Sequence, residues 1–81
     1  MKEILYFSAA WCGPCKMLGP TMESLKGQIN YRKIDVDTDT TLSAKYSVRN
    51  IPTLILLENG EVKNRITGVQ PKEQILNFYN G

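Results

Sequence analysis

Histidine is absent from this sequence, and cysteine occurs only twice. Without an imidazole, a cysteine–histidine nucleophilic pair of the protease type is excluded. A structural zinc ion normally binds four cysteine or histidine side chains, so one chain supplies only half of such a site. Zinc held by this chain, or shared between two copies, is therefore disfavoured as the purpose of the two cysteines.

The sequence also lacks long apolar runs and clusters of like charge. Its longest strongly apolar stretches are residues 4–7 and 54–57, far short of the roughly 20 residues that cross a bilayer. Residues 1–10 lack the apolar region of about 7 to 15 residues that a secretory signal needs. The 10 basic and 8 acidic residues give a formal net charge of +2 and are scattered singly, unlike the basic face of a nucleic-acid-binding protein. We therefore expect a mature cytoplasmic protein with neither membrane nor nucleic acid as partner.

Length and composition predict one domain over residues 1–81. A chain of 81 residues lies near the lower end of the roughly 50 to 250 residues of a compact domain. With 42% hydrophobic and 22% charged residues, the composition is typical of a globular protein that folds without a partner. We expect a monomer.

Hydrophobic periodicity divides the chain into seven elements. Apolar residues three and four positions apart predict amphipathic helices, whereas short apolar or alternating runs predict strands. In chain order we expect a strand at 3–8, a helix from Pro14 to about Gly27, a strand at 30–36, a short helix from Asp39 to about Tyr46, strands at 53–57 and 62–67, and a helix from Pro71 to the end. The order of elements is therefore βαβαββα.

The connections between these elements predict the sheet. A whole helix separates the first two strands, so they should be parallel with a right-handed crossover. The Asn59-Gly60 pair favours a tight turn between two antiparallel strands. The Gly19-Pro20 pair should kink the first helix, and the Ile51-Pro52 pair should end the second, because a residue before proline avoids helical angles. We expect an α/β fold with a four-stranded mixed sheet and helices on both faces.

Both cysteines lie in the segment Trp11-Cys12-Gly13-Pro14-Cys15. A disulfide stabilises a fold mainly by closing a long loop, so a loop this small gains little. Two intervening residues do bring the second thiol close enough to displace a partner from the first. At a helix start, unpaired N–H groups and the helix dipole would stabilise the thiolate of Cys12, whereas burial would disfavour that of Cys15. The pattern predicts that Cys12 attacks and Cys15 resolves, with an inert structural pair as the alternative.

The six residues from Trp11 to Lys16 resemble the active-site motif of thioredoxins. Ile51-Pro52-Thr53 is similar to the family's loop with a cis-proline opposite the disulfide, and Gly68 to the glycine beside that loop. The resemblance extends over residues 3–80. It implies the thioredoxin fold and a thiol–disulfide oxidoreductase that reduces protein disulfides and binds no cofactor. The implied substrate groove consists of Trp11, Gly13, Pro14, Ile51, Pro52 and Gly68.

Two features depart from this family. Thioredoxins usually carry an additional N-terminal strand and helix, so the chain resembles a minimal thioredoxin. The family's buried aspartate, six residues before the first active-site cysteine, corresponds to Tyr6, while its usual lysine neighbour corresponds to Lys33. A neutral phenol forms hydrogen bonds but does not readily take a proton, so deprotonation of Cys15 needs other help, such as water. Lys33 itself is expected to be a snorkelling strand lysine rather than a catalytic one.

The resemblance implies disulfide-containing protein substrates and an electron donor that is a thioredoxin reductase, a small dithiol or glutathione. One alternative is a glutaredoxin-like, glutathione-dependent enzyme. Against it, Gly-Pro separates the cysteines instead of a proline–aromatic pair, and Val69 follows Gly68 where glutaredoxins favour a second glycine. The other alternative is an accessory binding subunit, which would not need thiols. Strand-end solvation and helix capping explain Asp35, Asp37 and Asp39 better than a metal site does.

Overall fold

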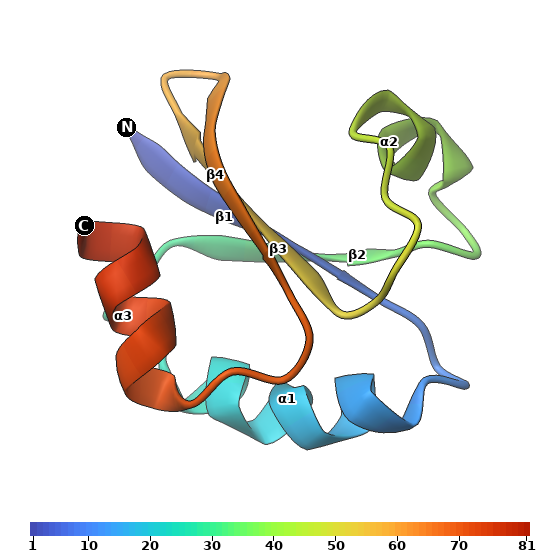
Figure 1. Cartoon of the computed structure of the whole chain (residues 1–81), viewed down its shortest axis with the longest axis horizontal. Helices are drawn as coiled ribbons and strands as arrows, with labels where there is room; N and C mark the ends of the chain where they lie inside the picture. Colours follow the sequence, from blue (N-terminus) through green and yellow to red (C-terminus); the bar gives the residue numbers. More distant parts are fainter.

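All seven predicted elements occur in the predicted order (Figure 1). The structure is a computed structural model that describes residues 1–81. The elements are β1 (Lys2–Ser8), α1 (Gly13–Ser24), β2 (Tyr31–Asp35), α2 (Thr40–Lys45), β3 (Thr53–Glu58), β4 (Glu61–Thr67) and α3 (Lys72–Asn80). None of the helices combines the length and the apolar character that a membrane crossing requires.

The strands form one mixed sheet in the order β2-β1-β3-β4. β1 pairs in parallel with β2 and antiparallel with β3, and β3 pairs antiparallel with β4. The predicted parallel pair and the predicted hairpin are therefore confirmed. The hairpin turn uses Asn59 and Gly60 at φ values of 54° and 85°, the left-handed geometry that such turns need.

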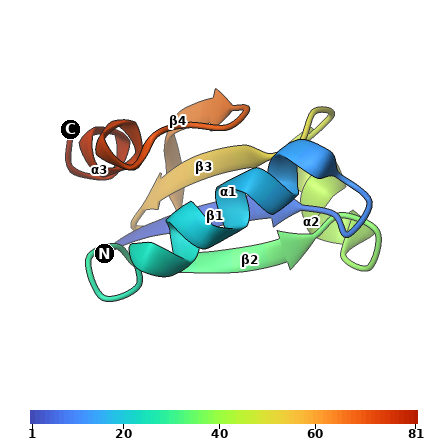
Figure 2. The ribbon, with the colours of Figure 1, turned by 90° about the horizontal axis from the view of Figure 1, so that it is seen from below.

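The helices cover both faces of the sheet, as predicted. Figure 2 shows α1 running along β1 and β2 on one face, with α2 behind the sheet. One apolar cluster joins β1 and β3 to α1 and α3, and a second joins the opposite faces of β1, β2 and β3 to residues of α2. Central β1 is therefore buried on both faces, which explains its continuous apolar run.

One helix end differs from the prediction. α1 ends at Ser24 rather than near Gly27, and Gly27, at a φ of 91°, lies in the turn that follows. The Asp39 carboxylate caps α2 as predicted, accepting the Leu42 N–H at 3.0 Å. α2 ends at Lys45 with Tyr46 as its C-cap, which agrees with the predicted end. The chain leaves the helical region at Ser47, which has a φ of 53°, so Ser47 rather than the Ile51-Pro52 pair ends the helix.

Candidate active site

The two cysteines lie where the chain leaves central strand β1 and enters α1. Cys12 is the N-cap of α1 and has an extended backbone, with a φ of −86° and a ψ of 113°. Its Sγ accepts a hydrogen bond from the Cys15 backbone N–H at 3.1 Å. Pro14 occupies the first turn of the helix, where its missing N–H leaves no bond unmade. Local sequence thus places one sulfur directly at the positive end of the helix dipole.

Cys12 and Cys15 are joined by a disulfide, with their Cα atoms 5.2 Å apart. Both residues are buried, with exposed fractions of 4% and 3%. The inward position predicted for Cys15 is confirmed, but in this oxidised form overall burial does not distinguish the two cysteines. The difference between them is local, since only Cys12 Sγ accepts a helix N–H.

The proline loop lies against the disulfide. The Ile51–Pro52 peptide bond is cis, as the resemblance implied, and Pro52 is buried. The carbonyl oxygen of Ile51 lies 3.8 Å from Cys12 Sγ. Gly68, at a φ of 87°, donates its N–H to the Pro52 carbonyl at 2.9 Å. The fold thus brings three of the predicted groove residues together around the cysteine pair.

Trp11 projects beside the cysteines and is 68% exposed, as expected for a wall of a binding groove. Its indole Nε1 donates a hydrogen bond to Asp37 Oδ2 at 2.8 Å. Sequence reasoning assigned Asp37 only to solvation at the end of a strand. The available signal was topological, because β1 and β2 are parallel and the segments after them leave the same edge of the sheet.

Tyr6 is buried directly beneath the active-site helix, with an exposed fraction of 2%. Its hydroxyl donates to the backbone carbonyl oxygen of Cys15 at 3.2 Å. Its ring packs edge-on against Tyr31, with centroids 6.3 Å apart. At the position of the family's buried carboxylate there is therefore a neutral group that contacts the backbone of Cys15.

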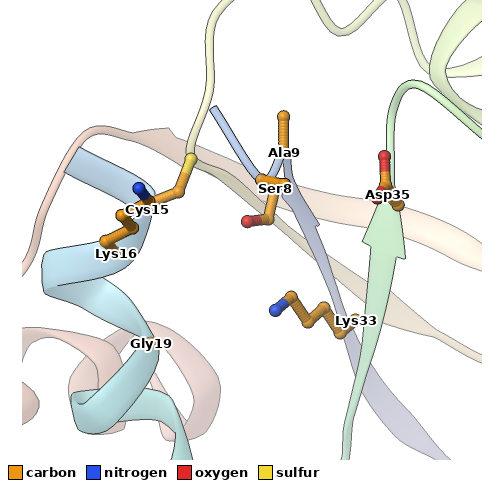
Figure 3. A pocket seen from close by; sticks show the side chains of 8 residues that line it. Ser8, Ala9, Cys15, Lys16, Gly19, Lys33 and Asp35 are labelled. Carbon is orange, nitrogen blue, oxygen red and sulfur yellow. The ribbon is translucent and has the colours of Figure 1, made fainter. Parts of the chain in front are cut away.

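A pocket of about 310 Å³ lies beside Cys15 (Figure 3). Its wall combines the end of β1, the first turns of α1 and the exposed face of β2. The lining residues are Ser8, Ala9, Ala10, Cys15, Lys16, Gly19, Lys33 and Asp35. Figure 3 shows the Lys33 side chain leaving β2 and extending toward α1.

The arrangement defines a class of protein by its chemistry. Two sulfurs in a four-residue turn can pass between a dithiol and a disulfide, and so exchange two electrons and two protons with another disulfide. The helix N-terminus stabilises the thiolate that this exchange requires. The class is that of the dithiol–disulfide oxidoreductases.

Comparison with known proteins identifies the family. The Thioredoxin family model matches residues 2–80. A thioredoxin of Staphylococcus epidermidis is 43% identical over 77 residues, which cover 90% of this chain and 74% of the relative. A thioredoxin of Staphylococcus aureus is 42% identical over the same shares. The chain belongs to the thioredoxin family, and it is a thiol–disulfide oxidoreductase that reduces protein disulfides.

Solved structures agree with this assignment. A mutant thioredoxin from Halobacterium salinarum NRC-1 superposes with a TM-score of 0.91 at 37% identity, over 98% of this chain and 72% of that one. Fasciola hepatica thioredoxin superposes with a TM-score of 0.90 at 29% identity, over 98% of this chain and 78% of that one. The predicted thioredoxin fold is confirmed.

Proposed function

We propose that Cys12 is the thiol that attacks the substrate disulfide and that Cys15 is the thiol that resolves the mixed disulfide. The observation that carries the proposal is the hydrogen bond from the Cys15 N–H to Cys12 Sγ at the N-terminus of α1. In the reduced protein the same N–H would stabilise a Cys12 thiolate, because a hydrogen bond to an ionised acceptor is stronger than one to a neutral acceptor.

The substrate would bind in the groove formed by Trp11, Gly13, Pro14, Ile51, Pro52 and Gly68. Ile51 supports this proposal because neither its N–H nor its carbonyl takes part in a backbone hydrogen bond. An extended substrate segment would pair with these groups as a short added strand. Its cysteine would then lie next to Cys12 Sγ, which is 3.8 Å from the Ile51 carbonyl oxygen.

The proposal extends to the setting of the reaction. Residues 1–81 act as one domain and as a monomer in the cytoplasm. A thioredoxin reductase returns the electrons, with a small dithiol or glutathione as the alternative donors. Because the two sulfurs carry the electrons themselves, the exchange requires no bound cofactor.

Turnover with insulin as substrate tests the roles of the two cysteines. Cys12→Ser should abolish reduction, and Cys15→Ser should accumulate as a mixed disulfide because the resolving thiol is missing. Full turnover by either variant would contradict the two-cysteine mechanism. The same assay run with a thioredoxin reductase or with glutathione separates the proposed enzyme from a glutaredoxin-like one. A chain active only with glutathione would favour the second.

A further inference from the structure

The turn that follows α2 has a serine at the position where this type of helix end favours glycine. The Val48 N–H donates to the Ser43 carbonyl oxygen at 2.9 Å. The Ser47 N–H donates to the Ala44 carbonyl oxygen at 3.1 Å. These two bonds form a Schellman motif, in which the residue after the C-cap adopts a left-handed conformation. That residue is Ser47, with a φ of 53°, and a side chain makes this conformation unfavourable. We therefore expect another element to stabilise the turn.

Arg65 on β4 supplies this stabilisation. Its guanidinium donates one hydrogen bond to the Ser47 carbonyl oxygen at 3.4 Å and another to the Tyr46 carbonyl oxygen. No backbone N–H donates to either oxygen. The guanidinium forms no ion pair, because the two ion pairs of the structure involve other residues. Arg65 is the register partner of Ile55, so its side chain lies on the face of the sheet that α2 covers.

The turn at Ser47 begins the segment that leads to the proposed substrate edge. Residues 48–50 connect the turn to Ile51, and the chain runs from α2 back to the start of β3 (Figure 1). The far end of this segment is fixed by the buried Thr53, whose hydroxyl donates to the Asn50 carbonyl oxygen. The near end has hydrogen bonds from one side chain only, that of Arg65.

We propose that Arg65 is a positioning residue for the edge at Ile51, and that it sets the affinity for extended protein substrates without taking part in the exchange between sulfurs. The inference rests on the proposed function, in which a substrate segment pairs with the N–H and carbonyl groups of Ile51. A loose turn at Ser47 would let this edge move, and substrate binding would then have to order it, which weakens association. With Arg65 in place, the edge is ordered before the substrate arrives.

The test compares a protein disulfide with a small one. Single-turnover oxidation of the reduced protein, measured across insulin concentrations, gives the half-saturating concentration and the limiting rate without any electron donor. Arg65→Met should raise the half-saturating concentration about fivefold and leave the limiting rate unchanged. The small aromatic disulfide DTNB cannot pair along Ile51 as a strand, so its rate of reduction should stay unchanged.

Lys63→Met is the matched control, because Lys63 is exposed on the same strand but lines a pocket next to α3. It removes the same charge from β4 and should change neither the half-saturating concentration nor the limiting rate. Ser47→Gly tests the route by which Arg65 acts, since glycine adopts a positive φ without a steric penalty. In a Ser47→Gly background, Arg65→Met should raise the half-saturating concentration by less than about twofold.

A merely structural role for Arg65 would lower the urea midpoint of Arg65→Met and leave the half-saturating concentration for insulin unchanged, and this result would overturn the inference. An equal loss of rate with DTNB would also overturn it, because the defect would then lie at the cysteines. So would an equal rise with and without Ser47→Gly, because Arg65 would then not act through the turn. Failure of the proposed groove shows separately, as an unchanged half-saturating concentration for insulin in Trp11→Ala.

Discussion

At the scale of single residues, Tyr6 distinguishes this chain from the family pattern. A carboxylate at this position would lie beneath Cys15, on the face of the sheet that also carries Lys33, its register partner on β2. Tyr6→Asp should therefore quicken the decay of a Cys12 mixed disulfide at neutral pH. It should also destabilise the fold by several kcal/mol, because it replaces a buried ring with a buried carboxylate.

Stopped-flow decay across pH, alongside urea unfolding, measures both effects of Tyr6→Asp. Tyr6→Phe is the control, since it removes only the hydrogen bond to the Cys15 carbonyl. It should reduce stability by about 1 kcal/mol and give no increase in rate. A folded Tyr6→Asp protein with an unchanged rate and pH profile would show that this position does not affect proton removal.

The contact between Trp11 and Asp37 leads to a second prediction. The Asp37 carboxylate holds an otherwise exposed indole in one orientation. Asp37→Ala should release the ring and raise KM for protein disulfides a few-fold, because orienting the ring on binding then opposes association. The free energy of unfolding measured in urea should change by less than about 1 kcal/mol, because the hydrogen bond between Trp11 and Asp37 is exposed. Asp37→Asn keeps an acceptor oxygen and should behave like the unmodified protein, so equal KM values for the alanine and asparagine variants would contradict this role.

At the scale of elements, α2 depends on its cap. With six residues, it is too short to be stable alone in water. Asp39→Ala removes the bond to the Leu42 N–H and should lower the free energy of unfolding by about 1 kcal/mol. Insulin reduction should stay unchanged, because α2 lies away from the cysteines. Urea unfolding with Asp39→Asn as the capping control checks this, and an unchanged stability for Asp39→Ala would show that the cap contributes nothing.

Elements were also the scale at which the sequence was most informative. The two periodicities, the crossover between β1 and β2 and the Asn59-Gly60 pair were sufficient to predict the order of elements and the directions of the strands. The end of α2 near Tyr46 was predicted, but its cause was not, because Ser47 adopts a positive φ that is uncommon for serine. The Trp11–Asp37 contact and the pocket beside Cys15 were missed because they depend on side chains from separate elements meeting in space.

At the scale of the whole molecule, Tyr31 makes the free energy of unfolding depend on pH in the alkaline range. Burial, and next the negative charge of Glu23, raise the pKa of Tyr31 above its usual value. The unfolded chain therefore loses this proton more readily than the folded one. The stabilisation is complete below the unfolded pKa of about 10 and is lost as pH rises through the folded pKa.

Urea unfolding between pH 8 and 11 measures this linkage, by comparing the unmodified protein with Tyr31→Phe. The free energy of unfolding should fall more steeply above about pH 10 in the unmodified protein. If the free energy of unfolding fell equally with pH in the two proteins, this result would contradict a raised pKa of Tyr31.

The central claim is that the fold makes two nearly equally buried sulfurs chemically different, by placing Cys12 at the N-terminus of α1. Alkylation of the reduced protein with limiting iodoacetamide at neutral pH, followed by mass mapping of the modified peptide, tests it most directly. The account predicts that Cys12 is modified first, because its thiolate is the stabilised one. Modification of Cys15 first would contradict the assignment of both roles.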